Sequence, residues 1–233
     1  MKAVILAGGL GTRLSEETSY KPKPMVEIGG YPILWHIMNH YSKFGYIDFV
    51  ILLGYKGYII KEYFVNYFLH NSDFTVDLGN NNVEIINKQN LNWKVTLVDT
   101  GINSMTGARV KKVEHIVGNN TFMLTYGDGL IDLNINELVQ FHKTHEGAVT
   151  MTSAQPDGRF GALEISDNKV VQFQEKPKGD GSWINAGYFV CDKDLFKYIE
   201  NGDDVVLEQG PLKLLAKENQ LFKNHSSFLL ENG

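Results

Sequence analysis

Short apolar runs alternate with longer stretches in which apolar residues recur at helical spacing. The short runs predict strands buried on both faces, at residues 3–6, 49–53, 94–99 and 121–126. The longer stretches predict helices over residues 33–44, 57–70 and 134–145, and another that ends near Gly118. In the helix over 57–70, the expected core stripe is Ile60, Phe64, Tyr67 and Phe68. This alternation predicts an α/β fold with a parallel sheet and crossover helices.

The second half of the chain changes to a β-rich pattern with turns between the segments. Strands are predicted at residues 148–154, 160–165, 170–174, 184–190 and 221–223, with short helices at 194–199 and 208–218. We interpret residues 160–190 as an antiparallel extension of the sheet. The Asn-rich stretch at 72–93 predicts a hairpin inserted at the sheet edge. No repeat or linker divides the chain, so a single domain over residues 1–233 fits best.

The first strand runs into a glycine-rich segment, Ala7-Gly8-Gly9-Leu10-Gly11-Thr12-Arg13. Its glycines let the backbone turn sharply and approach a ligand closely. Successive N–H groups in such a turn form an anion site, to which Thr12, Arg13, Lys21 and Lys23 add donors and positive charge. The segment therefore predicts a loop that holds the phosphates of a nucleotide. The alternative is a tight turn with surface charges.

Two better-known phosphate motifs do not fit this segment. The P-loop needs a Gly-Lys pair followed by a hydroxyl residue, and the sequence has none. The dinucleotide fingerprint needs a third glycine where Leu14 stands and an acidic residue at the end of the second strand, where Val50 to Leu53 are apolar. The loop therefore belongs to another class of nucleotide site.

Polar segments follow three of the predicted parallel strands. They are Gly8 to Arg13, Asp99 to Arg109, and Gly127-Asp128-Gly129. Ligands of open α/β sheets collect at the carboxyl ends of the strands, so these segments are expected to meet at one edge. Asp128 between two glycines is a candidate ligand for Mg²⁺, which takes one or two carboxylates beside phosphates. An ordinary turn aspartate is the alternative.

The β-rich half carries further polar groups at its predicted strand ends. Glu175, Lys176 and Asn185 are a carboxylate, an ammonium and an amide, which suit a hydroxyl-rich, phosphorylated ligand. Exposed turn polarity is the alternative interpretation.

Composition narrows the class of protein. The 233 residues are 43% hydrophobic and carry a formal net charge of −5, which argues against a nucleic-acid binder. The single cysteine, Cys191, excludes an internal disulfide framework and is expected to be a buried thiol. Neither a signal peptide nor a membrane span is recognisable, so we expect a soluble, cytoplasmic protein.

Together these segments resemble the signature of the sugar-1-phosphate nucleotidyltransferases. Leu6 to Leu14 with Lys23-Pro24 is typical of that superfamily as a whole. Within it, the match is closest to the glucose-1-phosphate cytidylyltransferases, and the likeness extends to about residue 228. It includes Lys21-Pro22-Lys23-Pro24-Met25, Thr100-Gly101, Tyr126-Gly127-Asp128-Gly129 and Arg159-Phe160-Gly161-Ala162. Two further segments are typical of the cytidylyl branch: Ser104-Met105-Thr106-Gly107 and Glu175-Lys176-Pro177-Lys178-Gly179-Asp180-Gly181.

The resemblance implies a Rossmann-like, mostly parallel mixed sheet flanked by helices, of the nucleotide-diphospho-sugar transferase type. Residues 1–154 would bind the nucleotide and residues 155–233, the β-rich part, the sugar phosphate. The implied reaction transfers a cytidylyl group from CTP to glucose 1-phosphate, giving CDP-glucose and pyrophosphate for deoxysugar or polysaccharide biosynthesis. The family assembles as homo-oligomers, so the same is expected here.

The resemblance also assigns roles to single residues. Arg13 and Lys23 would be catalytic, since they neutralise charge as pyrophosphate leaves, and Asp128 would bind Mg²⁺. The nucleotide would contact Leu6, Ala7, Gly8, Gly9, Leu10, Gly11, Thr12, Arg13, Lys23, Ser104, Thr106, Gly107, Arg109 and Gly127. The sugar phosphate would contact Gly161, Glu175, Lys176, Asn185 and Gly187.

The likeness departs at Leu229 to Gly233, where the family has a strand whose aspartate is the second metal ligand. Glu231 stands two residues out of register with that aspartate. Two alternatives therefore accompany the enzyme hypothesis: a non-catalytic nucleotide-sugar-binding or assembly subunit, and a nucleotidyltransferase for another base or sugar.

Overall fold

The computed structural model describes residues 1–10, 20–86, 91–155, 162–166, 169–174 and 183–225. Its strands are β1 (Lys2–Ala7), β2 (Glu27–Ile28), β3 (Tyr31–Pro32), β4 (Asp48–Leu53), β5 (Phe74–Asp77), β6 (Asn82–Ile85), β7 (Lys94–Asp99), β8 (Phe122–Tyr126), β9 (Val149–Ala154), β10 (Ala162–Ser166), β11 (Lys169–Gln174), β12 (Ile184–Cys191) and β13 (Leu221–His225). Its α-helices are α1 (Ile33–Lys43), α2 (Gly57–Val65), α3 (Tyr67–Asn71), α4 (Thr106–Lys111), α5 (Glu114–Val117), α6 (Ile135–His142) and α7 (Pro211–Lys217). Two 3₁₀ helices are η1 (Lys23–Met25) and η2 (Lys193–Tyr198).

A seven-stranded sheet forms the centre of the molecule, in the order β13-β9-β12-β8-β1-β4-β7. All its neighbouring strands are parallel except where β12 pairs with β8 and β9. The predicted mostly parallel mixed sheet is therefore confirmed. The antiparallel extension is only partly right, because β12 lies inside the sheet, and β10 and β11 form a separate two-stranded sheet.

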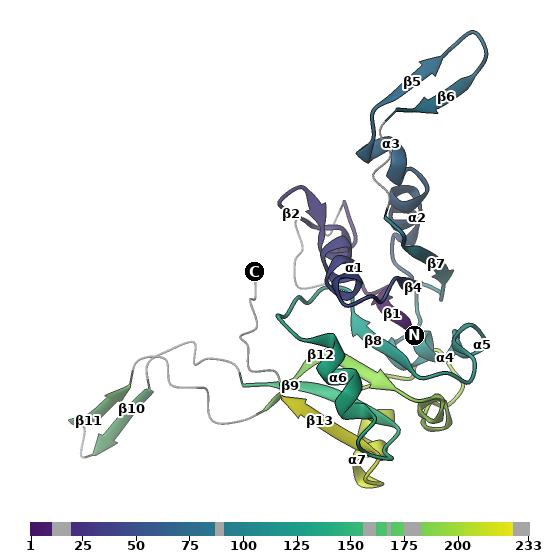
Figure 1. Ribbon diagram of the computed structural model, residues 1–233. Helices are drawn as coiled ribbons and strands as arrows, with labels where there is room; N and C mark the ends of the chain where they lie inside the picture. Colours follow the sequence, from purple (N-terminus) through teal and green to yellow (C-terminus); the bar gives the residue numbers. More distant parts are fainter. Residues whose placement is uncertain (11–19, 87–90, 156–161, 167–168, 175–182, 226–233) are drawn as a thin grey trace.

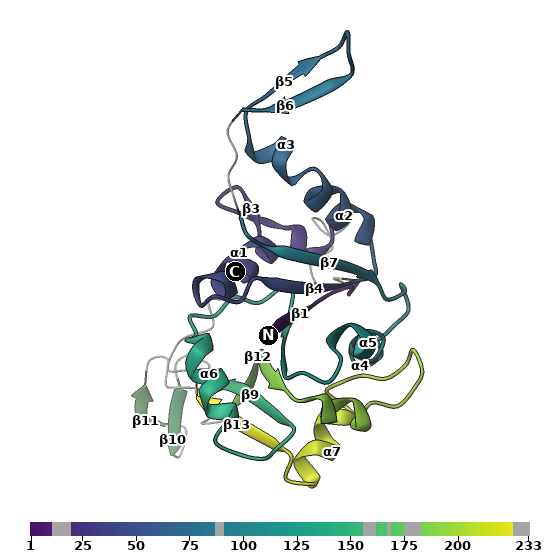
Figure 2. The same ribbon diagram turned by 45° about the vertical axis from the view of Figure 1, so that its right-hand side comes forward.

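Helices lie on both faces of the central sheet (Figure 2), and each face has its own hydrophobic core. On β1, Ala3, Ile5 and Ala7 belong to the core that α1 and α6 cover. Val4 and Leu6 belong to the core that includes residues of α4, α5 and α7. Since side chains of a strand alternate between faces, this is why β1 reads as a continuous apolar run. Cys191 is fully buried in the second core, as expected.

Two predicted helices are each broken in the structure. The stretch at 57–70 forms α2 and α3, because Asn66 between them leaves helical geometry at φ −95°, ψ 10°. Phe68 was expected in the core stripe, but it is 47% exposed, so that assignment is wrong. The stretch that ends near Gly118 likewise forms α4 and α5.

The predicted hairpin is β5–β6, which extends away from the central sheet beyond α3 (Figure 1). Within the described residues, its strands pair with each other and with no strand of the central sheet, contrary to the expected insertion at the sheet edge. Register places apolar residues of both strands on one face of the hairpin and polar residues on the other. The apolar face consists of Phe74, Val76, Val83 and Ile85. The first three of these side chains are each at least 42% exposed.

The antiparallel direction of β12 matters for the site. Strands β1, β4, β7 and β8 run in one direction and end at one edge of the sheet, whereas β12 begins there. Asn185, near the start of β12, is thereby brought beside Tyr126, the last residue of β8. A β-bulge between Asn185 and Phe189, with Gly187 at φ +84°, adjusts the course of β12 at this point.

Candidate active site

A pocket opens at the carboxyl ends of β1 and β8, between the segments that follow β1, β7 and β8. It is lined by Leu6, Ala7, Gly8, Gly9, Leu10, Lys23, Pro24, Ile102, Asn103, Ser104, Met105, Thr106, Arg109, Tyr126 and Asp128. The predicted meeting of three polar segments at one edge is thus present in the structure. Most of the expected nucleotide contacts that lie in the described residues line this pocket.

Arg109 joins the segments around the pocket. The side chain is 4% exposed, and its guanidinium donates hydrogen bonds to groups on three different segments. The acceptors are the carbonyl oxygens of Gly8, Leu53, Gly101 and Ile102 and the hydroxyl of Thr100. Burial lowers the pKa of Arg109. The arrangement shows that Arg109 holds the loops in place, which motif matching did not foresee.

The absence of side chains at Gly8 and Gly54 makes room for this arginine. A Cβ atom built on either glycine would collide with the Arg109 guanidinium. The backbones of the two loops also meet directly, since the N–H of Tyr55 donates to the carbonyl of Gly8 at 3.2 Å. Gly8 is therefore required for close packing, whatever its role toward a ligand.

Ser104 is held by a second polar cluster. Its hydroxyl donates to Thr100 O and lies 2.7 Å from Asp203 Oδ1. Lys112 Nζ donates to the same Thr100 oxygen, to Ser104 Oγ and to Asp203 Oδ1. The hydrogen bond from the Lys112 ammonium lowers the pKa of Asp203. This cluster fixes the loop between β7 and α4, which forms one wall of the pocket.

Lys23 and Asp128 face each other at the pocket. Their Nζ and Oδ2 atoms are 2.8 Å apart, and both side chains are about one third exposed, at 34% and 41%. Lys23 comes from η1 and Asp128 from the loop after β8, so the ion pair joins two segments far apart in the sequence. The expected catalytic lysine and the expected metal ligand are thus paired with each other.

A chain of hydrogen bonds runs beside the pocket from α4 to β12, and two of its members, Thr106 and Tyr126, line the pocket. Thr106 Oγ1 donates to Glu208 Oε2 at 2.7 Å, and the Tyr126 hydroxyl donates to Glu208 Oε1. The Tyr126 oxygen accepts a bond of 3.3 Å from Asn185 Nδ2. Burial and the bond to Glu208 raise the pKa of Tyr126, so its hydroxyl stays protonated. Sequence reasoning missed Glu208, which stands 82 positions from Tyr126 and in no recognised motif.

Three further glycines of the expected site are required for packing. A Cβ on Gly187 would lie 2.7 Å from the Tyr126 ring, and one on Gly127 would lie 2.7 Å from Leu6 O. A Cβ on Gly107 would lie 2.9 Å from Val205. Each of these contacts is closer than side-chain carbons approach, so glycine is needed at all three positions.

Part of the expected site lies outside the described residues. These positions are Gly11, Thr12, Arg13, Gly161, Glu175, Lys176 and Glu231. Of the expected sugar-phosphate contacts, Asn185 and Gly187 are described, and both lie beside Tyr126.

Asp128 is the carboxylate at the pocket that the sequence predicts to bind a metal ion. Among the described residues, no group of three or more His, Cys, Asp or Glu side chains could hold a metal ion. Mg²⁺ is usually bound by one or two carboxylates and by substrate phosphates, so a single carboxylate at the pocket fits an ion that arrives with a nucleotide. The contact with Lys23 uses Oδ2 of Asp128, so an ion at this carboxylate would lie beside the Lys23 ammonium.

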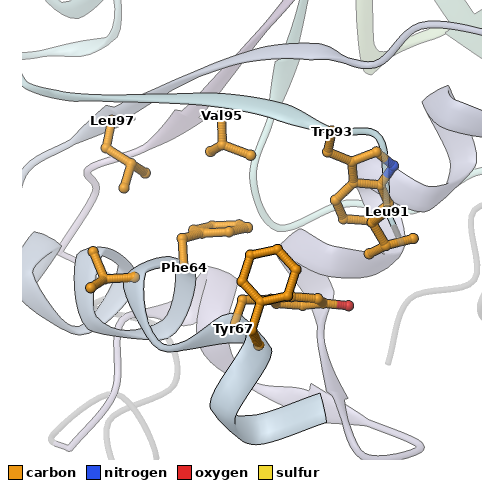
Figure 3. A pocket seen from close by; sticks show the side chains of 8 residues that line it. Phe64, Tyr67, Leu91, Trp93, Val95 and Leu97 are labelled. Carbon is orange, nitrogen blue, oxygen red and sulfur yellow. The ribbon is translucent and has the colours of Figure 1, made fainter. Parts of the chain in front are cut away.

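A second pocket is apolar and lies between α2, α3 and β7 (Figure 3). Phe64 and Tyr67 face Val95 and Leu97 across it, with Leu91 and Trp93 at one end. Its lining offers few polar groups, so it is no candidate for phosphate chemistry.

None of the described helices is long and apolar enough to cross a membrane.

Comparison with known proteins gives consistent matches over nearly the whole chain. The family model for nucleotidyl transferases matches residues 2–227. Glucose-1-phosphate cytidylyltransferase of Salmonella typhi is 57% identical over 222 residues, covering 95% of this chain and 86% of that protein. The protein of the same name from Salmonella typhimurium is also 57% identical over 222 residues, with coverage of 95% and 86%.

Among solved structures, HddC from Yersinia pseudotuberculosis, complexed with GMP-PN, matches with a TM-score of 0.68. The match is 24% identical and covers 97% of this chain and 91% of that one. A likeness at this identity concerns the fold alone. Together with the mixed seven-stranded sheet, it confirms the Rossmann-like fold expected from the sequence.

Proposed function

The chain belongs to the nucleotidyl transferase family, and we propose that it transfers a cytidylyl group from CTP to α-D-glucose 1-phosphate. The products are CDP-glucose and pyrophosphate. The observation that carries this proposal is the likeness to the Salmonella glucose-1-phosphate cytidylyltransferases over nearly the whole chain. The pocket at the carboxyl edge of the sheet supports it, because its walls come from segments that carry the resemblance to that family.

In the proposed reaction, a phosphate oxygen of glucose 1-phosphate attacks the α-phosphorus of CTP. A new P–O bond forms, the bond to the bridging oxygen of the β-phosphate breaks, and pyrophosphate leaves. Since the attacking oxygen belongs to the substrate, the protein needs no nucleophile of its own. Its contribution is in-line positioning and electrostatic stabilisation, and positioning alone can contribute about 7–11 kcal/mol.

We assign the residues as follows. The segment from Gly8 to Arg13 holds the triphosphate, and Arg13 and Lys23 neutralise the charge that develops on pyrophosphate. Ser104 and Thr106 line the nucleotide side of the pocket. Glu175, Lys176 and Asn185 meet the sugar phosphate. Mg²⁺, when bound, neutralises triphosphate charge, and Asp128 is the described carboxylate at the pocket that would hold it.

One assay tests the function. The purified protein is incubated with Mg²⁺, glucose 1-phosphate and each nucleoside triphosphate in turn, and pyrophosphate release is followed. We expect the highest rate with CTP and the loss of that rate when EDTA removes the metal. Binding of CTP without turnover of any triphosphate would overturn the enzyme in favour of a binding subunit. Faster turnover with UTP or dTTP would assign another base.

The proposal extends to the location and the assembly of the enzyme. The net charge of −5 favours small-molecule substrates over nucleic acid, and we place the protein in the cytoplasm, where sugar nucleotides are made and used. The exposed apolar face of β5–β6 supports assembly with further copies of the chain. Residues 1–154 and 155–233 are proposed to act as one domain, since β12 lies between β8 and β9.

A further inference from the structure

The hydrogen-bond chain through Glu208 and Tyr126 joins the two substrate sides of the pocket. At one end is Thr106, on the nucleotide wall, and at the other is Asn185, proposed to meet the sugar phosphate. The two residues between them are not otherwise assigned any role. Tyr126 itself lines the pocket, whereas Glu208 lies behind it and contacts both Thr106 and Tyr126.

The geometry points to Tyr126 and Glu208 as positioning residues that orient Asn185 toward the sugar phosphate while the nucleotide is held by the opposite wall. This inference rests on the proposed function, because it concerns how the same pocket places its second substrate. Neither residue takes part in bond making or breaking.

The Tyr126 ring is held firmly enough to serve this purpose. The bulge at Gly187 brings backbone against one side of the ring, where a Cβ would approach to 2.7 Å. Phe189 packs against it edge-on with ring centroids 6.0 Å apart. The hydroxyl donates its only hydrogen to Glu208, and its oxygen therefore accepts from Asn185. The direction of these hydrogen bonds is therefore set by the carboxylate of Glu208, which can only accept.

Asn185 is in turn fixed on both sides of its amide. Its Oδ1 accepts from the N–H of Gly187 at 2.8 Å, and its Nδ2 donates to Tyr126. An amide nitrogen carries two hydrogens, so the second remains to donate to a hydroxyl or phosphate oxygen of the sugar phosphate. Removing the Tyr126 hydroxyl frees this amide to rotate without opening a cavity.

Glu208 has a wider effect than Tyr126. Its second oxygen accepts from Thr106, whose oxygen also accepts from the N–H of Leu207 at 2.9 Å. A glutamine there presents one acceptor and one donor, so either Thr106 or Tyr126 loses its partner. Substitution of Glu208 is therefore expected to disturb both walls, and substitution of Tyr126 only the sugar-phosphate wall.

The test compares Tyr126→Phe, Glu208→Gln and Tyr198→Phe with the unchanged protein. Tyr198 is the matched control, because its hydroxyl also donates to a glutamate, Glu218, and it does not line the pocket. Steady-state kinetics give KM for glucose 1-phosphate and for CTP, and calorimetry gives the affinities for CTP and for CDP-glucose. Thermal unfolding verifies that each variant is folded.

For Tyr126→Phe we expect KM for glucose 1-phosphate to rise about three- to tenfold, the range that one neutral hydrogen bond supports. CTP affinity should stay unchanged, while CDP-glucose affinity falls. Glu208→Gln should weaken both substrates, and Tyr198→Phe neither. Equal effects of Tyr126→Phe on both substrates, or no effect on either, would overturn the inference.

The two proposals can fail separately. If the unchanged protein turns over no triphosphate, the comparison of CTP with CDP-glucose binding still reports on Tyr126. If it binds no nucleotide at all, both proposals are wrong. Should Glu208→Gln not fold, Tyr126→Phe decides alone, since it keeps the ring and its packing.

Discussion

At the scale of single residues, Arg109 shows how a side chain next to a ligand pocket can serve the protein itself. Its guanidinium joins the loops after β1, β4 and β7, and two glycines give it room. The resemblance to the family placed Arg109 in the nucleotide pocket, and the structure places it in the wall of that pocket. A buried group with so many backbone partners keeps the loops in a set geometry before a ligand arrives.

This role makes a prediction for stability. Arg109→Lys removes several of the hydrogen bonds that join the loops, because an ammonium cannot reproduce the planar arrangement of the guanidinium. We expect the melting temperature to fall by about 2–12 °C, because the lost hydrogen bonds contribute about 1–3 kcal/mol in total and each kcal/mol corresponds to about 2–4 °C. Lys197→Ala, which removes an exposed cation, is the control for differential scanning calorimetry. Equal melting temperatures would contradict the structural role.

The Lys23–Asp128 pair makes a prediction for activity. Both side chains are partly exposed, so their ion pair contributes little to stability. Lys23→Ala and Asp128→Asn should each lower kcat by a factor of about 100 or more, as removal of electrostatic stabilisers typically does. Lys2→Ala breaks an ion pair of similar length, 2.7 Å, between β1 and β4 and should leave kcat unchanged. Near-normal rates in the two site variants would refute the assigned roles.

At the scale of elements, the β5–β6 hairpin stands apart from the central sheet. Two-stranded hairpins are marginal in water, and this one exposes an apolar face. The apolar pocket between α2, α3 and β7 lies next to α3, the helix that leads into this hairpin (Figures 1 and 3). An interface between copies of the chain would cover such a face.

Changing the hairpin face should therefore alter the assembly. We expect Val76→Thr combined with Val83→Thr to shift the protein toward smaller species in sedimentation velocity, because threonine keeps the strand propensity and removes apolar surface. Thr75→Ser combined with Glu84→Gln changes the opposite face and should sediment like the unchanged protein. A protein that is monomeric at micromolar concentration from the outset would contradict the proposed assembly.

The sequence predicted an element well where the periodicity of its own apolar residues determines its structure. It predicted an element poorly where strands or side chains far away in the chain determine its position. The strands β1, β4, β7 and β8 follow from local apolar runs. The insertion of β12 between β8 and β9 does not, because nothing local distinguishes an inner antiparallel strand from an added edge strand. The same reason hides Glu208, whose partners Thr106 and Tyr126 are 102 and 82 positions away in the chain.

At the scale of the whole molecule, the two proposed parts are interleaved. Strands β8 and β9 belong to residues 1–154, yet both pair with β12, and β13 pairs with β9. Without the sugar-phosphate part, β8 would keep only β1 as a neighbour, and β9 would lose both of its neighbours. The sheet thus supports the proposal that substrate binding by both parts depends on one cooperative structure.

Cutting the chain at this boundary should show the dependence. A fragment of residues 1–154 lacks β12, so the backbone groups of β8 and β9 that face it lose their partners. We expect no cooperative thermal transition by circular dichroism for this fragment, whereas the full chain should show one. A sharp transition in the fragment would mean that residues 1–154 fold independently.

The position of β12 also has a consequence during synthesis on the ribosome. Strand β8 is complete at residue 126, but its neighbour on one side is not complete until residue 191. For the time needed to translate the intervening segment, an apolar strand edge is open to pairing with other nascent chains. The yield of this protein in cells should therefore depend on translation speed and chaperone supply more than its final stability suggests.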